Sequence, residues 1–158
     1  MRTRMVASLG TRQHEPREDP LARPVTDADI QAIARLMLDA YRGTADDGGE
    51  SFDDAVAEVT KLLAGAYGEF DRHASEVIVR DAELVSATFV TRYENEPLIA
   101  FSMTSPQWKR RGLARAGLVR VMDRLRAAGE PRVRLVVTNG NTPAEALYAS
   151  LGFVADGP

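Results

Sequence analysis

Three stretches between Ser75 and Thr104 alternate polar and apolar residues, and this two-residue period constrains the fold more than any other feature. The stretches read SEVIVRD, ELVSATFVTRY and PLIAFSMT, and Val, Ile, Phe and Thr recur through them. Alternation of this kind is typical of strands that are half-buried in a sheet. The short polar segments DAE and ENE between the stretches are suited to tight turns. The sequence therefore predicts an antiparallel meander of three strands.

Helical periodicity flanks the meander on both sides. We expect helices over 26–43, 51–63, 113–128 and 142–151, and one further strand over 132–138. Thr142 is the expected N-cap of the last helix, with Pro143 and Glu145 in its first turn. A meander followed by a strand-helix-strand unit predicts an α/β (α+β) fold, with a mixed, mostly antiparallel central sheet flanked by helices.

The first 20 residues differ in composition from the rest of the chain. They are polar, contain proline and show no sustained period apart from the short run MVASL. Such a segment buries too little apolar surface to offset the entropy of ordering it. We therefore expect residues 1–20 to form a mobile arm and residues 21–158 to form a single domain.

The composition excludes several classes of site. The chain has 158 residues, a net charge of -3 and no cysteine, which removes disulfides, thiolate metal ligands and a cysteine nucleophile. Only two histidines are present, so we expect no metal site. The acidic balance argues against a nucleic-acid partner, and no apolar run is long enough to cross a membrane. The N-terminus lacks a continuous apolar signal region, so a cytoplasmic protein is expected.

A cationic turn precedes the helix over 113–128. Lys109, Arg110 and Arg111 stand directly before Gly112, although cations at a helix N-terminus oppose the helix dipole. The first N–H groups of a helix have no intrahelical partner, so an anion such as a pyrophosphate can bind there. The alternative is a solvated basic helix start in which the glycine serves packing.

The segment from Ser102 to Phe153 resembles the GCN5-related N-acetyltransferases. The pyrophosphate loop of that family reads Arg/Gln-x-x-Gly-x-Gly/Ala, and here the matching residues are Lys109-Arg110-Arg111-Gly112-Leu113-Ala114. Lysine in the first position departs mildly from the pattern. A second motif, N-x-x-A-x-x-L-Y-x-x-x-G-F, begins at Asn141 and ends at Phe153. The resemblance covers nearly all of residues 21–158.

This resemblance implies an acetyl-CoA site where the strand before Pro106 splays from the strand over 132–138. Acetyl-CoA is then a co-substrate, and Tyr148 is the general acid that protonates the departing thiolate. The implied cofactor contacts are the backbone at Met103 and Thr104, the loop residues Lys109, Arg110, Arg111, Gly112, Leu113 and Ala114, and Asn141. Family members continue past Gly-Phe into another strand. The final strand of this chain is therefore expected to be short or supplied by a partner, which suggests a homodimer.

Without a cysteine, an acyl-cysteine intermediate is impossible, so we expect an amine to attack the thioester directly in a ternary complex. The base for this attack stays open. The candidates are Glu94 and Glu96 in a hairpin turn, Asp46, Asp47 and Glu50 in an acidic loop, and a water relay. Of these, Glu96 is the carboxylate we name as a possible catalytic base.

The acceptor itself is not identified by the sequence. The acidic loop would line the acceptor side in this family, which suits the amine of a small molecule or a peptide. The alternative function is a catalytically silent module that binds acetyl-CoA as a regulator. The presence of Tyr148 favours the enzyme, because a module that only binds has less need of an acid at that position.

Overall fold

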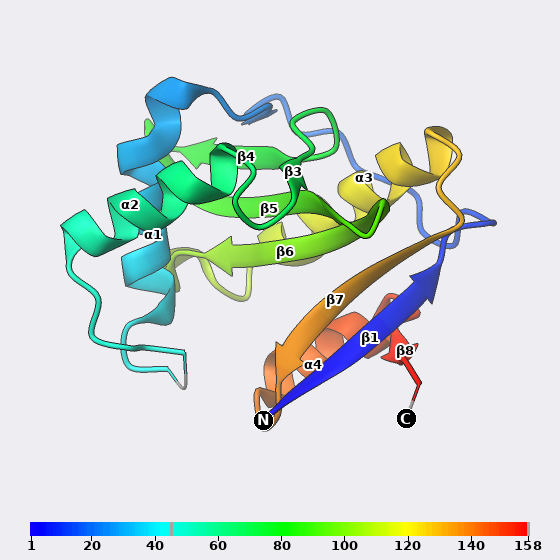
Figure 1. Cartoon of the computed structure of the whole chain (residues 1–158). Helices are drawn as coiled ribbons and strands as arrows, with labels where there is room; N and C mark the ends of the chain where they lie inside the picture. The colour runs from blue at the N-terminus through cyan, green and yellow to red at the C-terminus, as the bar shows by residue number, and fades with distance from the viewer. Residues whose placement is uncertain (45, 158) are drawn as a thin grey trace.

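The fold is a single twisted sheet with helices on both faces (Figure 1). The computed structural model describes residues 1–44 and 46–157. Within these residues the strand order is β2-β4-β5-β6-β7-β1-β8, and β3 pairs with β5. The strands are β1 Arg2–Ser8, β2 Ala22–Arg23, β3 Glu69–Phe70, β4 Glu76–Arg80, β5 Glu83–Tyr93, β6 Glu96–Thr104, β7 Arg132–Thr138 and β8 Val154–Ala155. The helices are α1 Ile30–Tyr41, α2 Phe52–Leu63, α3 Leu113–Ala127 and α4 Thr142–Ser150, with 3-10 turns η1 Asp27–Asp29 and η2 Pro106–Trp108.

The predicted meander is confirmed as β4, β5 and β6, which pair in antiparallel register. Two-residue turns join the strands, at Asp81–Ala82 and at Glu94–Asn95, and all four residues have positive φ angles. Two consecutive left-handed residues match the twist of a hairpin, which explains the tight connections. The predicted mixed, mostly antiparallel sheet is therefore present, and the pairing of β6 with β7 is its parallel element.

The helices cover the two faces of the sheet separately. α1 and α2 pack over one face, with Phe89 and Met103 in the shared core. α3 and α4 belong to the second core, with Val90 and Ile99 from the same strands. Neighbouring strand residues such as Phe89 and Val90 therefore point to opposite sides, as the two-residue period requires. None of the helices in the described ranges is both long and apolar enough to cross a membrane.

The structure shows the N-cap residues of three helical segments, and the cap predicted for the last of them is wrong. Thr26 caps η1, and the Ser51 hydroxyl accepts a hydrogen bond from the Asp54 N–H at the start of α2. The N-cap of α4 is Asn141 rather than Thr142, because the Asn141 side chain accepts from the Ala144 N–H. Asparagine and threonine are both good caps, so the sequence could not separate neighbouring positions.

The predicted mobile arm over residues 1–20 is wrong for its first part. Arg2–Ser8 form β1, which pairs with β7 along its whole length and with β8 at Met5 and Val6. Ala7 and the following Leu9 are buried in the core beneath α3. The backbone hydrogen bonds of a long antiparallel pairing and two buried apolar side chains hold this segment in place.

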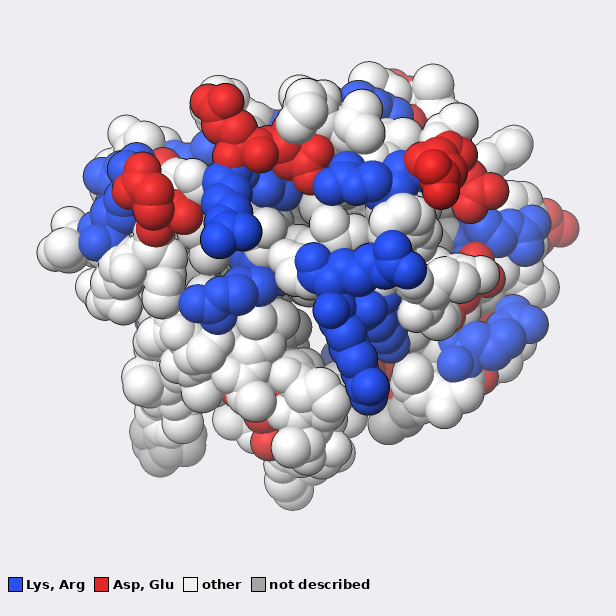
Figure 2. Space-filling view, turned by 180° about the vertical axis from the view of Figure 1, so that it is seen from behind, with Lys and Arg blue, Asp and Glu red and all other residues white. Residues whose placement is uncertain are grey.

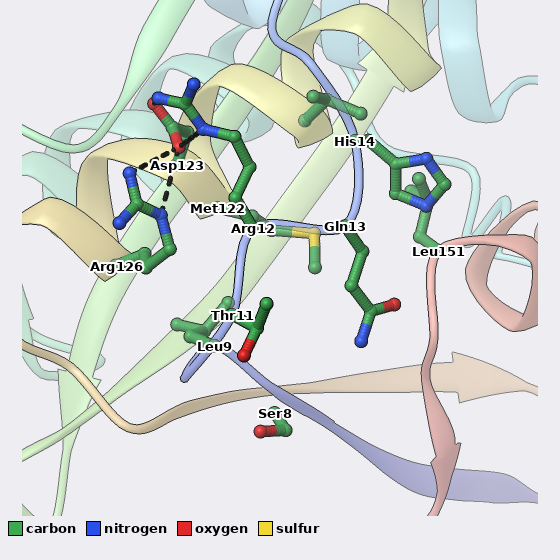
Figure 3. Close-up of a pocket in the computed structure, with 11 residues that line it drawn as sticks. Ser8, Leu9, Thr11, Arg12, Gln13, His14, Met122, Asp123, Arg126 and Leu151 are labelled. Carbon is green, nitrogen blue, oxygen red and sulfur yellow. Dashed lines mark hydrogen bonds and ion pairs between the residues drawn. The ribbon is translucent and has the colours of Figure 1, made fainter.

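Residues 9–20 are tied to the domain by charges. The Arg12 guanidinium forms a two-pronged contact with Asp123 on α3, with nitrogen to oxygen distances of 2.8 and 2.9 Å. Asp19 pairs with Arg80 at 2.6 Å. Figure 3 shows the segment crossing α3 beside a pocket of about 30 Å³, which has room for ordered water and for nothing as large as a cofactor. The whole N-terminal segment is therefore part of the domain.

The prediction that the final strand is short is confirmed. The final strand, β8, has two residues and pairs with β1. The position beside β7 is occupied by β1 of the same chain, so no partner strand is required there. The homodimer stays a prediction.

A buried ion pair joins α3 to the sheet. Arg120 donates to both carboxylate oxygens of Glu76, at 3.0 and 2.7 Å, and Arg124 donates to the same carboxylate at 2.9 Å. Arg120 also donates to the backbone carbonyl of Arg17. The Arg120 side chain is therefore buried between α3 and β4 rather than exposed to solvent.

Candidate functional site

β6 and β7 separate from one another and open a cleft. Their parallel pairing is limited to Leu98 with Arg134 and Ile99 with Leu135. Directly after Ile99, the register of β6 with β5 shifts, which leaves Ala100 as a bulge. A bulge bends its strand and increases the local twist, so β6 turns away from β7 at this point. Figure 1 shows the two strands diverging toward their C-terminal ends.

The cleft between the splayed strands has a volume of about 730 Å³. Ile99–Ser102 of β6 line one wall and Leu135–Thr138 of β7 line another, while α1, α2 and α4 close the remaining sides. This is the size of a small-molecule site. Beyond Ile99, the edge of β6 that faces β7 has no strand partner among the described residues. The backbone groups on that edge are therefore available to a ligand.

The cationic turn lies between the end of β6 and the start of α3. Arg110 and Gly112 both have positive φ angles, of 64° and 79°, and Gly112 is the N-cap of α3. A left-handed residue followed by a helical one directs successive N–H groups toward one point, which is the geometry of an anion nest. A Cβ built on Gly112 meets no atom within 4 Å, so the space in front of this backbone is open.

The charges of the turn surround this open backbone. Lys109, Arg110 and Arg111 are exposed, and the Arg111 guanidinium lies 4.5 Å from the centre of the Trp108 ring. Arg115, one turn into α3, donates to the Ser150 hydroxyl of α4. In Figure 1, α3 lies behind the sheet, and Figure 2 shows Lys and Arg side chains gathered near the middle of that rear face. The exposed cations Lys109, Arg110 and Arg111 therefore directly precede the N-terminus of α3, where an anion can bind.

Tyr148 lies on the inner side of α4 and lines the cleft. Its ring packs edge-on against Phe153, with 5.9 Å between the ring centres. Burial raises the pKa of the Tyr148 phenol above its ordinary value, and the Ser102 hydroxyl of β6 opposes this shift. The phenol is therefore protonated at neutral pH and available as a hydrogen-bond donor in the cleft.

A second tyrosine in the cleft was missed by the sequence analysis. Tyr41, at the C-terminal end of α1, lines the cleft with Tyr148. Burial raises the pKa of Tyr41, the charges of Tyr148 and Asp46 add to the shift, and Arg2 opposes it. In the sequence Tyr41 is one of the apolar-face positions of a helix, so nothing in the pattern separated it from core residues.

Some predicted cofactor residues lie beside the cleft rather than in it. Met103 and Thr104 are buried and pair with Ala87 and Ser86 of β5, so the residues that line the cleft are the preceding ones of β6. Asn141 does line the cleft, at the N-terminus of α4. The bulge at Ala100 lies within the part of β6 that lines the cleft, and the sequence pattern did not reveal it.

The structure does not bring Glu96 into the cleft. Its carboxylate lies at the opposite end of β6, where it forms ion pairs with Arg132, at 2.5 Å, and with Arg134. Glu94 is exposed in the hairpin turn beside it. The carboxylates that line the cleft come instead from the acidic loop and α2, namely Asp46, Asp47, Glu50, Asp54 and Glu58. A base for an acceptor has to be sought among these groups.

Several solved structures with the same fold are named as acetyltransferases. A GCN5-related N-acetyltransferase from Sphaerobacter thermophilus superposes with a TM-score of 0.75 at 18% identity, over 98% of this chain and 48% of that one. The ribosomal-protein-S18-alanine N-acetyltransferase from Escherichia coli gives 0.65 at 19% identity, over 83% and 75%. The PaiA N-acetyltransferase from Thermoplasma acidophilum, solved with coenzyme A, gives 0.68 at 13% identity, over 85% and 89%. This chain thus spans about half the length of the first of these proteins.

The sequence comparison agrees with the fold. No curated protein matches the chain significantly. The family model described as "Acetyltransferase (GNAT) family" matches residues 34–153, which include the cleft strands, the cationic turn and α4. Since this match extends over well more than half of the 158 residues, the chain belongs to the GNAT family of acetyltransferases.

Proposed function

We propose that this chain is an acetyl-CoA-dependent N-acetyltransferase that moves an acetyl group directly to the amine of a small molecule or peptide. The observation that carries the proposal is that β6 links the cleft to the cationic turn, whose residues Lys109 to Ala114 lie outside the cleft lining itself. One end of β6 leads into the unpaired N–H groups of the α3 N-terminus, and the splayed edge of β6 leads to Tyr148. A long ligand with a phosphate end and a thioester end fits this arrangement.

The phosphate end is matched to the cationic turn. The N–H groups of Leu113 and Ala114 begin α3, so neither can donate to a preceding helical carbonyl. The open space at Gly112 permits close approach of a pyrophosphate to the backbone. Lys109, Arg110 and Arg111 supply compensating positive charge. The solved PaiA neighbour binds coenzyme A, which supports the same class of ligand here.

The chemistry of the transfer needs one proton donor at the sulfur. A neutral amine attacks the thioester carbon, a C–N bond forms, and the C–S bond breaks. The nitrogen loses one proton and the sulfur gains one. An amine that binds as an ammonium releases one further proton to water before the attack. Tyr148 donates to the departing sulfur, and the proton from the nitrogen restores the phenol. Unpaired N–H groups on the β6 edge polarise the carbonyl oxygen.

The acceptor is proposed to be an amine because the cleft wall opposite β6 is rich in carboxylates. The E. coli neighbour is named as an acetyltransferase of an alanine in ribosomal protein S18. Its name supports a peptide amine as one possible acceptor class for this fold. The carboxylates fit a small cationic amine equally well, so both classes belong in the test.

The test is a screen of an acceptor panel with detection of free CoA, together with calorimetry of acetyl-CoA binding. The panel contains small amines, amino-acid amides and short peptides with free N-termini. We expect acetyl-CoA binding, and CoA release that depends on an amine and is absent with the matching alcohols. Tight binding of acetyl-CoA without release by any acceptor would favour the regulatory module, and absence of binding would contradict the proposal.

A further inference from the structure

Several carboxylates line the acceptor side of the cleft, and three of them accept hydrogen bonds from backbone N–H groups. Asp47 accepts hydrogen bonds from two backbone N–H groups of its own loop, and Glu50 accepts from one. Asp54 accepts from the backbone N–H at the N-cap of α2. Glu58 lies on α2, and its carboxylate raises the pKa of the Tyr67 phenol. Both oxygens of Asp47 are therefore bonded within its own loop, and none of these four carboxylates forms a hydrogen bond with β6 or β7 among the described residues.

Asp46 is arranged differently from its neighbours. It accepts a hydrogen bond from the Thr138 hydroxyl at 2.9 Å, which carries it from the α1–α2 loop to the C-terminal end of β7. Asp46 lines the cleft, and its second carboxylate oxygen makes no hydrogen bond or ion pair with any residue in the described ranges. The contact with Thr138 thus holds one Asp46 oxygen where β6 and β7 separate, and the other Asp46 oxygen has no partner among the described residues.

The surroundings of Asp46 are those of a polar recognition site. Tyr41 and Tyr148 line the same part of the cleft, and the pKa of the Tyr41 phenol is raised by its burial and by the charges of Tyr148 and Asp46. Arg2 lies opposite Thr138 in the β1–β7 register and also lines the cleft. Arg2 forms no ion pair with Asp46 within the described residues, so this carboxylate is not paired with a cationic side chain there.

We propose that Asp46 binds the ammonium group of the acceptor and holds it beside Tyr148, so that the acceptor is a protonated amine when it binds. The inference rests on the proposed function and names the specificity-determining residue of that site. Thr138 is a positioning residue, because it holds the carboxylate at the end of β7. A carboxylate with one oxygen fixed and one free binds an ammonium by a charge-assisted hydrogen bond.

The experiment measures amine binding without requiring turnover. The full chain is saturated with CoA and titrated with n-butylamine, while two-dimensional NMR follows the backbone amides. The neutral match is n-butanol, which has the same carbon chain without the charge. We expect n-butylamine to bind and n-butanol not to bind. In Asp46→Asn the Kd for n-butylamine should rise at least tenfold, as expected for loss of one charge-assisted hydrogen bond.

The matched control is Glu58→Gln, which removes the same charge from the same cleft at a side chain on α2 that forms no hydrogen bond with β7 among the described residues. Its Kd for n-butylamine should stay within about twofold of the wild-type value. The Kd of Thr138→Val should lie between those of Asp46→Asn and Glu58→Gln. Equal losses in Asp46→Asn and Glu58→Gln would show a diffuse effect of charge and overturn the inference. The same holds if n-butylamine does not bind the wild type, or binds Asp46→Asn unchanged.

Calorimetry with acetyl-CoA on the same samples separates the two claims. Wild type, Asp46→Asn and Glu58→Gln should bind acetyl-CoA with equal affinity, because none of these positions lies in the cationic turn. If acetyl-CoA does not bind the wild type, the proposed function fails. If acetyl-CoA binds but the Kd for n-butylamine is the same in Asp46→Asn and wild type, only the inference about Asp46 fails. Well-dispersed amide spectra of the variants exclude unfolding as the cause.

Discussion

Met5 of β1 lies opposite Leu135 of β7, so the N-terminal strand extends the sheet directly beside the strand that lines the cleft. The same segment continues into Leu9, which is 3% exposed beneath α3. The stability of the cleft wall therefore depends on residues that are most distant from it in sequence. This relationship leads to the first prediction.

Leu9→Ala should destabilise the domain by about 2–4 kcal/mol, because it empties a buried leucine site in a packed core. Leu21→Ala is the matched control, since Leu21 is 49% exposed, and its effect should stay within about 0.5 kcal/mol. Urea unfolding followed by circular dichroism measures both. Equal and small effects would mean that the segment before residue 10 does not pack in solution.

The second prediction concerns acid stability. The Arg23 guanidinium and the N–H and hydroxyl of Thr26 hold the pKa of Asp29 below its ordinary value. The unfolded chain therefore binds this proton more readily, so the contribution of Asp29 is present above about pH 4 and is lost as the pH falls through the lowered folded-state pKa. Asp29→Asn should cost about 1–2 kcal/mol at pH 7.

The same difference between wild type and Asp29→Asn should shrink steadily below pH 4. Urea midpoints measured from pH 7 to pH 2.5 test this course. Asp27→Asn serves as the control, because Asp27 pairs with Arg72 at the surface, where an ion pair contributes little. If the loss of unfolding free energy in Asp29→Asn does not change with pH, it comes from altered packing or hydrogen bonding and not from the charge of Asp29.

The parts of the fold that follow from local patterns were predictable from sequence. The meander, its two tight turns and the cationic turn before α3 are all encoded within short windows around residues 75–115. β1 was missed because its pairing partner lies 130 residues away, and an Arg- and Thr-rich strand carries little apolar alternation of its own. Its burial becomes visible only when β7 is beside it.

The site shows the same division. The cationic turn and Tyr148 could be proposed as site residues from sequence because each lies in a local motif that the family resemblance covers. The bulge at Ala100, in the cleft-lining part of β6, depends on pairing with β5 and could not be predicted from a local pattern. The choice among carboxylates likewise required tertiary contacts, since only the fold places Glu96 beside two arginines and Asp46 beside Thr138.

The third prediction isolates the phenol of Tyr148. Tyr148→Phe keeps the ring that packs against Phe153 and removes only the hydroxyl, so stability and acetyl-CoA affinity should change little. With an acceptor found in the screen, kcat should fall about 100-fold, within the range for one general acid. Stopped assays under saturating acetyl-CoA measure this rate, and Tyr93→Phe, at an exposed position, is the control.

The pH profile gives a second check on Tyr148. Because burial raises the pKa of this phenol, the wild-type rate should not decline from its ionisation until the pH exceeds about 10. A decline at lower pH that persists in Tyr148→Phe belongs to another group. An unchanged kcat in Tyr148→Phe, where chemistry limits the rate, would assign Tyr148 to packing alone.

The most direct test of the account is acetyl-CoA calorimetry on Gly112→Glu and Gly129→Glu. Both glycines have positive φ angles and open space at the Cβ position, and they stand at opposite ends of α3. The backbone strain of the two substitutions is therefore similar, and the helix dipole favours the new carboxylate at position 112. Gly112→Glu should bind acetyl-CoA about 100-fold more weakly than wild type, because its charge enters the pyrophosphate nest, while Gly129→Glu should bind normally. Equal affinity of Gly112→Glu and wild type would contradict the assignment of the cleft to acetyl-CoA.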